Sequence, residues 1–256
     1  MVEALGGNGQ RPSAGSGFSI TVLGSDGSYP GPGGACSGYL VRADGFSTWL
    51  EAGPGTMANL QLHVPLDRLD AAVVSHSHAD HCSDLESLYV AMRYFVGRQG
   101  FPVYVPEGLH ASVKSEHFDG TFEWHVVSDG DTAELGPARW TWRRTDHPVE
   151  TMAARAETDG RALGYSADTG PAWKFSDLGE GLTLALVEAS LTTEAEGTMQ
   201  HLSARQAGAA AAGAGAERLL LTHLTPPRDR AQAREEAEAS FGAQVDLAQV
   251  GKTWQI

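Results

Sequence analysis

Short apolar runs, bounded by glycine, proline or polar clusters, follow one another along most of the chain, which is the pattern of β-strands. The first three lie at 18–23, 37–42 and 47–51 and predict an antiparallel opening sheet. Later runs predict strands at 71–74, 102–105, 122–127, 139–143, 163–166, 182–187, 218–222 and 244–250. All are strand-sized, well short of the roughly 20 apolar residues of a membrane span.

Three stretches between these runs show helical signals. Residues 85–96 carry apolar side chains at helical spacing, which predicts an amphipathic helix with Leu85, Leu88, Tyr89, Met92 and Phe95 on its apolar face. Ser203 is typical of an N-cap for the small-residue stretch 207–216. The alternating charges of 229–241 predict a surface helix.

The first 17 residues are dominated by small and polar types and lack the basic and apolar regions of a signal peptide. We expect a flexible tail at 1–17. Residues 18–256 show no domain boundary and no internal repeat, so we expect a single domain there. We also expect the protein to be soluble and cytoplasmic.

The charge of the chain restricts its partners. Eighteen basic residues against 32 acidic ones give 256 residues a net charge of −14. Long nucleic acids and anionic membranes are bound by clustered Lys and Arg, so this balance disfavours both. Two cysteines, Cys36 and Cys82, are too few for a disulfide scaffold or a thiolate zinc knuckle, so any metal must be held by histidine and carboxylate.

The densest chemical signal follows the predicted strand at 71–74. His76, His78 and His81 fall within six residues, with Asp80 among them. In an extended loop His76 and His78 can point the same way, while Asp80 and His81 face a second point nearby. Such donors suit Zn²⁺, with Mn²⁺ or Fe also admissible. The alternative, a solvated polar turn, leaves the histidine density unexplained.

The His-x-His-x-Asp-His pattern after a short apolar strand resembles the metallo-β-lactamase superfamily. Three later motifs follow in family order: His147-Pro148, Tyr165-Ser-Ala-Asp168-Thr-Gly170 and Leu220-Leu-Thr-His223-Leu. The resemblance extends from about Phe18 to the C-terminus. It implies an α/β fold of four layers, an αββα sandwich in which helices flank two mixed β-sheets.

The resemblance also implies a centre of two Zn²⁺ ions. Its ligands would be His76, His78 and His147 for one ion, Asp80, His81 and His223 for the other, and Asp168 as the bridge between them. Taken alone, His147 would be interpreted as a surface-turn residue, Asp168 as a turn former or helix cap, and His223 as a satisfied buried histidine.

His201 lies just before a predicted helix and resembles a non-ligand proton donor of ribonuclease Z and related phosphodiesterases. Imidazole has a suitable pKa for such a general acid. The alternative is a residue at the start of a helix without chemistry. Glu188 either orients His201 or is satisfied locally at a strand end. We expect His201 and Asp80 to take part in catalysis.

The reaction implied by the resemblance is hydrolysis by a hydroxide shared between two metal ions. Only about twenty residues separate His147 from Asp168, so the RNA-clamping arm of ribonuclease Z enzymes that process tRNA has no room. A proton donor favours an alkoxide leaving group over a thiolate. The fragments Val22-Leu-Gly-Ser, Glu188-Ala-Ser, His201-Leu-Ser and Leu221-Thr-His bring the resemblance closest to actinobacterial cyclic nucleotide phosphodiesterases of this fold.

We therefore expect a dinuclear zinc phosphodiesterase that cleaves a small anionic substrate, a cyclic nucleotide such as cAMP. The alternatives are a carboxyl, thioester or lactone hydrolase, a ribonuclease Z-like nuclease, and a non-catalytic metal or nucleotide sensor. The sequence leaves open whether the chain forms a homodimer.

Several further positions are expected to lie beneath or beside the predicted metal centre. Glu51 stands where such proteins often carry an aspartate under the metal loop, and Ala167 where glycine is common. Arg143 and Arg144 are candidate anion contacts, of which at most one is expected to reach the pocket because strand residues alternate. The glycine-rich segment 24–34 is expected to form a loop at the pocket rim.

Overall fold

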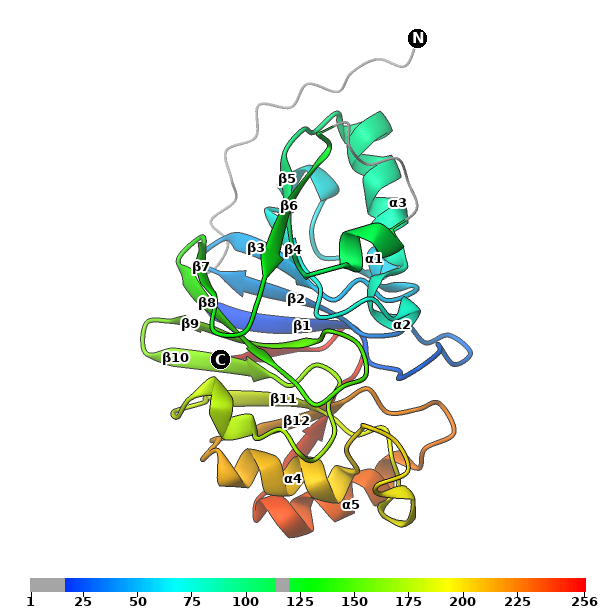
Figure 1. The fold of residues 1–256 in the computed structure, drawn as a ribbon, viewed down its shortest axis with the longest axis vertical. Helices are drawn as coiled ribbons and strands as arrows, with labels where there is room; N and C mark the ends of the chain where they lie inside the picture. Colours follow the sequence, from blue (N-terminus) through cyan, green and yellow to red (C-terminus); the bar gives the residue numbers. More distant parts are fainter. Residues whose placement is uncertain (1–16, 114–119) are drawn as a thin grey trace.

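The computed structural model describes residues 17–113 and 120–256, so the expected tail falls outside the described residues except for Gly17. Two seven-stranded sheets lie face to face (Figure 1). The first has the order β14-β1-β2-β3-β4-β5-β6 and the second the order β13-β12-β11-β10-β9-β8-β7.

The first sheet begins with the antiparallel strands that the sequence predicts, joined by β14 at its edge. From β3 to β6 the strands are parallel. The bounds are β1 (Phe18–Gly24), β2 (Gly38–Ala43), β3 (Phe46–Leu50), β4 (Ala71–Val73), β5 (Phe101–Pro106), β6 (Phe122–Val127) and β14 (Thr253–Gln255).

The second sheet is mixed in the same way. Strands β7 to β10 are antiparallel, and β10 to β13 are parallel. The bounds are β7 (Thr132–Leu135), β8 (Ala138–Arg144), β9 (Met152–Thr158), β10 (Arg161–Tyr165), β11 (Leu184–Glu188), β12 (Leu219–Thr222) and β13 (Val245–Leu247).

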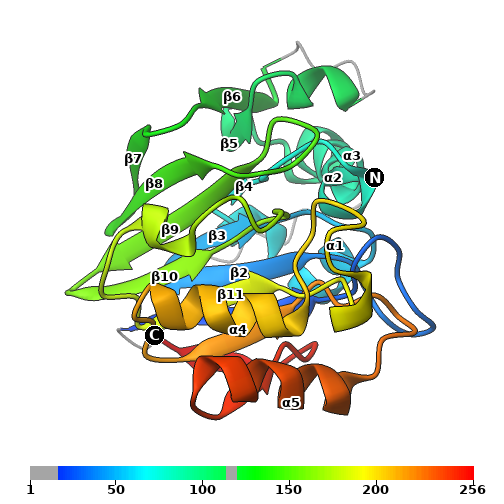
Figure 2. The same cartoon turned by 60° about the horizontal axis from the view of Figure 1, so that its bottom comes forward.

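Helices cover the outer faces of both sheets. The first sheet carries α1 (Thr56–Leu60), α2 (Ala79–Cys82) and α3 (Asp84–Ala91), and the second carries α4 (Ala204–Gly213) and α5 (Arg230–Phe241). In Figure 2, α4 and α5 lie side by side along the second sheet. Ser203 caps α4 in a reciprocal pair with Gln206. Gly208 lets the helices approach, since a Cβ there would lie 2.5 Å from the Ala237 carbonyl oxygen.

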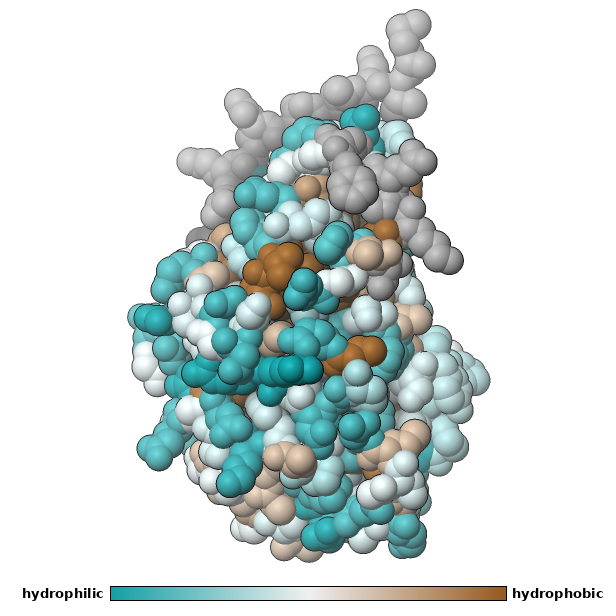
Figure 3. Space-filling view, viewed as in Figure 1, coloured by the Kyte–Doolittle hydropathy of each residue, from teal (hydrophilic) through white to brown (hydrophobic). Residues whose placement is uncertain are grey.

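Three hydrophobic clusters separate these layers. One fills the space between the sheets, around Tyr39, Trp140 and Trp142. The others lie between each sheet and its helices, around Trp49 and Phe175. The face drawn in Figure 3 is mostly hydrophilic, with small hydrophobic areas. This arrangement is the expected four-layer αββα sandwich with two mixed sheets.

Two sequence predictions need correction. The helix expected at 85–96 is α3 followed by a π-helical turn, η2 (Met92–Val96). The wider turn rotates the end of the helix, so Phe95 is 84% exposed instead of lying on the apolar face. The expected last strand, 244–250, is the shorter β13, and a further strand, β14, follows it. No helix within the described ranges is long and apolar enough to cross a membrane.

Candidate metal centre

The seven expected ligands meet where several strands end. Because β4, β10 and β12 run toward the same edge of the sandwich, the segments after them converge there, together with α2 and the loop after β8. The segment after β4 carries His76 and His78, α2 carries Asp80 and His81, and the segments after β8, β10 and β12 carry His147, Asp168 and His223.

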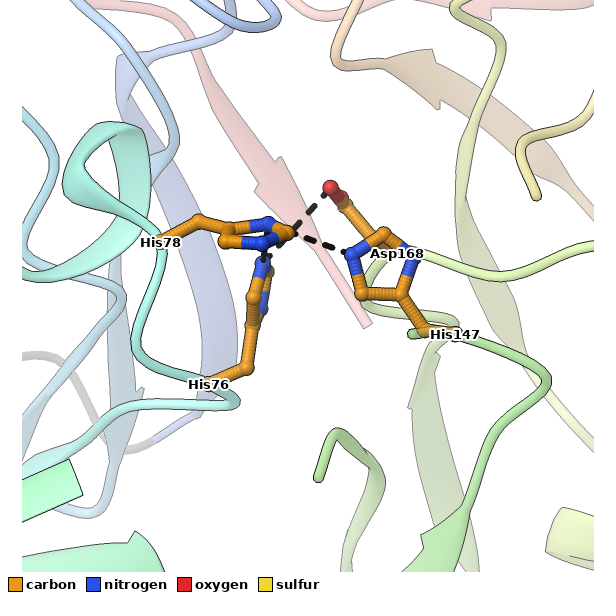
Figure 4. Close-up of side chains that lie close together, drawn as sticks. All are labelled: His76, His78, His147 and Asp168. Carbon is orange, nitrogen blue, oxygen red and sulfur yellow. Dashed lines mark hydrogen bonds and ion pairs between the residues drawn. The ribbon is translucent and has the colours of Figure 1, made fainter. Parts of the chain in front are cut away.

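The first group brings His76, His78, His147 and Asp168 together, with one ligand atom of each within 4.8 Å of the others. Figure 4 shows the three imidazoles and the carboxylate turned toward one another. Nδ1 of His78 lies 3.1 Å from Nε2 of His76 and 3.2 Å from Nε2 of His147. Oδ2 of Asp168 lies 3.7 Å from Nε2 of His76.

The second group consists of Asp80, His81 and His223. Nε2 of His223 lies 3.1 Å from both Nε2 of His81 and Oδ2 of Asp80. The other oxygen of Asp168, Oδ1, is 3.3 Å from Nε2 of His81 and 3.5 Å from Nε2 of His223. Asp168 therefore directs one oxygen to each group.

The outer nitrogens of four rings are tied to oxygen atoms, which turns their Nε2 atoms inward. Nδ1 of His76 lies 2.9 Å from Oγ of Ser75, and Nδ1 of His81 lies 3.2 Å from Oε2 of Glu51. Nδ1 of His147 lies 3.2 Å from the Gln200 carbonyl oxygen, and Nδ1 of His223 lies 2.8 Å from Oγ of Ser190. Such outer contacts fix the ring orientation of metal-binding histidines.

The cluster fits a divalent cation. Oδ1 of Asp168 is buried and has no hydrogen-bond partner, although ring nitrogens of two histidines lie close to it. Asp168 is 2% exposed, and His76 and His81 are fully buried. An unpaired carboxylate oxygen inside a shell of imidazole nitrogens is costly without a positive charge to compensate it. Imidazole and carboxylate donors match Zn²⁺ and related metals.

The electrostatics of the cluster favour ionised carboxylates. Burial alone would raise the pKa of Asp168, but the charges of His223 and His81 hold it well below its usual range. Burial also lowers the pKa of His76, and the neighbouring His81 lowers it further. Burial alone would lower the pKa of His81, but Asp168 and Glu51 raise this pKa well above its usual value. A bound cation would take the place of the proton that this raised pKa favours on His81.

His201 stands beside the cluster without joining either of the two groups above. Its Nδ1 lies 2.9 Å from Oε1 of Glu188, and its ring stacks on His223 with centroids 5.7 Å apart. Burial would lower the pKa of His201, but the charge and hydrogen bond of Glu188 raise it to about 9. Glu188 therefore contacts His201 and is also satisfied locally by the backbone N–H groups of Thr169 and Ser190, so both alternatives for this carboxylate describe part of its surroundings. Asp168, His201 and His223 also form a third set of nearby donors.

Three residues at the centre have a left-handed backbone that is unusual for residues other than glycine. They are Glu51 at φ 63°, Ala167 at φ 51° and His223 at φ 53°. Such conformations store strain and cluster at functional sites. Ala167 takes this conformation where the resembling family commonly has glycine, which does so without cost.

The remaining predicted positions are placed as follows. The backbone N–H of Ser28 donates to Oδ2 of Asp80 at 2.8 Å, so the glycine-rich loop does border the centre. Arg144 pairs with Glu150 at 3.1 Å. Arg143 donates to the Asp177 carbonyl at 3.2 Å. Both arginines line one open cavity of about 740 Å³ beside the loop that carries His147, although strand alternation was expected to turn one of them away, and none of the seven expected ligands lines this cavity.

Sequence reasoning missed three residues that hold the rings in place: Ser75, Ser190 and Gln200. Ser75 directly precedes His76, and Ser190 lies in the Glu188-Ala-Ser fragment, so both had a local signal. Gln200 acts through its backbone carbonyl, and no sequence pattern identifies such an acceptor.

A four-layer sandwich with histidines and carboxylates gathered at its strand ends defines a protein of the metallo-β-lactamase fold. Residues 49–224 match the family model described as the beta-lactamase superfamily domain. This match covers more than half of the chain, so the chain belongs to that superfamily.

Its relatives agree with this assignment. An uncharacterized protein of Mycobacterium leprae is 35% identical over 254 residues, 93% of this chain and 88% of that protein. The probable metallo-hydrolase YhfI of Bacillus subtilis is 30% identical, over 92% of this chain and 99% of its own length. The crystal structure of YhfI matches with a TM-score of 0.85 at 28% identity, covering 93% and 99% of the two chains. A ribonuclease Z of Kineococcus radiotolerans is 26% identical over 80% and 83%.

Proposed function

We propose that this metal-dependent hydrolase holds two zinc ions and cleaves a small cyclic nucleotide, such as cAMP, in the cytoplasm. The two groups of donors support two ion positions, with Asp168 between them. Bound divalent cations would lower the pKa of water toward neutrality and stabilise negative charge at the attacked centre. The protein supplies the ligands, the orientation of the rings and a proton donor.

The observation that carries the choice of substrate is the contact between Glu188 and His201. Nδ1 of His201 is engaged by the buried carboxylate at 2.9 Å, which leaves Nε2 as the free nitrogen of the ring. In the metal-free chain Glu188 raises the pKa of His201 to about 9, which favours the protonated ring. A protonated donor next to the centre is required for an alkoxide leaving group, such as a sugar oxygen, and much less for a thiolate.

The chain around the centre favours a small substrate. Between His147 and Asp168, β9 and β10 form a tight hairpin with its turn at Asp159 and Gly160, and the segment holds no arm that could clamp RNA. The net charge of −14 opposes long polyanions. At the centre, two divalent cations would outweigh the carboxylates and attract a small phosphodiester.

The test is turnover by zinc-loaded protein of 3′,5′- and 2′,3′-cyclic nucleotides, with products separated by chromatography. Acyl thioesters, lactones and a short tRNA precursor serve as competing substrates. We expect hydrolysis of at least one cyclic nucleotide at a kcat/KM well above that for the other classes. Absence of cyclic nucleotide hydrolysis by protein with confirmed zinc content would refute the proposal, and preferred turnover of a thioester or lactone would establish the alternative.

The role of His201 is tested by leaving-group dependence. His201→Ala should reduce kcat about 10²- to 10⁴-fold for a cyclic nucleotide, whose leaving group is an alkoxide. It should have little effect on an aryl phosphodiester with a nitrophenolate leaving group, which needs no proton. His63→Ala, outside the centre, is the matched histidine control. An equal loss on both substrates would contradict the role of proton donor.

A further inference from the structure

Ser190 lies between the two histidines that have different expected roles. Its hydroxyl oxygen is 2.7 Å from Oε2 of Glu188, 2.8 Å from Nδ1 of His223 and 3.5 Å from Nδ1 of His201. Ser190, Glu188 and His223 are all buried, so bulk water does not compete for these contacts. Ser190 therefore connects His201, the proposed proton donor, with His223, whose ring faces the proposed metal site.

The direction of the hydrogen bonds follows from the charges. The single hydroxyl proton of Ser190 has three possible acceptors close by: the Glu188 carboxylate at 2.7 Å, Nδ1 of His223 at 2.8 Å and the His223 carbonyl at 3.1 Å. The carboxylate is the closest acceptor and is charged, so it receives the proton. The hydroxyl oxygen then accepts from Nδ1–H of His223.

The direction of the hydrogen bond between His223 and Ser190 determines which ring nitrogen of His223 carries the proton. With the ring proton held on Nδ1, the lone pair of Nε2 is free, and Nε2 faces Asp80 and His81 at 3.1 Å. Imidazole binds a metal ion through such a lone pair. The reverse tautomer would place a hydrogen atom where the ion binds.

The other carboxylate oxygen of Glu188, Oε1, contacts the ring of His201. Oε1 of Glu188 accepts from the backbone N–H of Thr169 at 2.9 Å and from Nδ1 of His201 at 2.9 Å. Oε2 accepts from the backbone N–H of Ser190 at 3.3 Å in addition to its hydroxyl. Four donors fix the carboxylate, which in turn holds a proton on Nδ1 of His201 directly and on Nδ1 of His223 through the serine.

We propose that Ser190 is a positioning residue that extends the effect of Glu188 to His223, so that one buried carboxylate orients both the metal-facing ring and the proton-donating ring. The inference rests on the proposed function for the roles of the two rings. The network itself is independent of the substrate, so its test uses no substrate.

The experiment has two measurements on intact protein. In zinc-loaded protein with ¹⁵N-labelled histidine, NMR should show His223 protonated on Nδ1, with a slowly exchanging Nδ1 proton that weakens or disappears in Ser190→Ala. In a competition titration with a chromophoric chelator, Ser190→Ala should bind its weaker zinc ion about 10- to 100-fold less tightly than wild type. Ser190→Thr, which keeps the hydroxyl, should restore affinity to within a few-fold.

The controls separate positioning from general damage. Ser47→Ala removes another buried serine hydroxyl, in β3, and should leave zinc affinity unchanged. Wild-type zinc affinity in Ser190→Ala, or a His223 proton on Nε2 in the wild-type protein, would overturn the proposal. If Ser190→Ala fails to fold, a wild-type His223 proton on Nε2 still overturns the proposal, and zinc affinity of Ser190→Thr within a few-fold of wild type still supports it. If no cyclic nucleotide is hydrolysed while both measurements succeed, only the proposed function fails.

Discussion

Oε2 of Glu51 lies 3.2 Å from Nδ1 of His81, and both side chains are fully buried. The second oxygen, Oε1, accepts the backbone N–H of Ser75 at 2.9 Å. One carboxylate at the end of β3 therefore fixes both the loop after β4 and the first turn of α2. The left-handed backbone of Glu51 brings its side chain to this position beneath the cluster.

Replacement of Glu51 tests whether its charge matters. Glu51→Gln keeps the shape but cannot accept from both neighbours, so the amide favours a proton on Nε2 of His81, where a metal would bind. We expect zinc affinity to fall about 10- to 100-fold. Glu51→Asp keeps the charge and tolerates the left-handed backbone, so it should lose less. Chelator competition measures both variants, and equal affinities for Glu51→Gln and wild type would contradict the role.

The sequence predicts the part of the centre that is contiguous. The spacing of His76, His78 and His81 fixes their neighbourhood by itself, because a short loop after a buried strand keeps them together. His147 and His223 could be assigned only through family resemblance, since their approach depends on how the two sheets pack. Ser190 and His223 are in contact although they lie 33 positions apart in the sequence, and no local sequence pattern predicts such a contact.

The fold was predicted best where apolar runs are strong. The strand β9 was missed because Met152–Thr158 is rich in alanine, which favours helices. Pairing with β8 and β10 on both sides overrides that preference. The exposed position of Phe95 depends on a π-helical turn, and regular helical spacing cannot anticipate one extra residue in a turn.

Asp168 should be essential for the proposed two-ion centre, because each of its oxygens faces a different group. Asp168→Asn keeps the volume and removes the charge that compensates the cations. We expect bound zinc to fall from two ions per chain to one or fewer, measured by metal analysis after equilibrium dialysis, with loss of turnover. Asp70→Asn is the matched control, since its carboxylate accepts the backbone N–H of Ser47 away from the centre. Retention of two ions in Asp168→Asn would contradict a bridging position.

Ala167 offers a test of strain next to the centre. At φ 51° an alanine side chain carries a penalty that glycine does not. Ala167→Gly relieves about 1–2 kcal/mol of strain, but it also removes a methyl group buried between the sheets and adds freedom to the unfolded chain, so stability should stay within about 0.5 kcal/mol of wild type. Urea denaturation measures the change. Ala210→Gly in regular helix α4 should destabilise by about 1 kcal/mol, and an equal or larger loss in Ala167→Gly would show that strain at Ala167 is not relieved.

Protonation of His201 predicts how the stability of the metal-free protein depends on pH. Burial opposes the charge, but Glu188 raises the pKa in the folded chain to about 9, above the ordinary value of about 6.5 in the unfolded chain. The contribution is therefore complete below about pH 6.5 and is lost as pH rises through about 9. His201→Gln removes it. Denaturation with urea, after chelator treatment, should show the stability difference between wild type and His201→Gln shrinking from about pH 6 to about pH 9.5. A difference that stays constant or grows over this interval would mean that the folded state does not favour protonated His201.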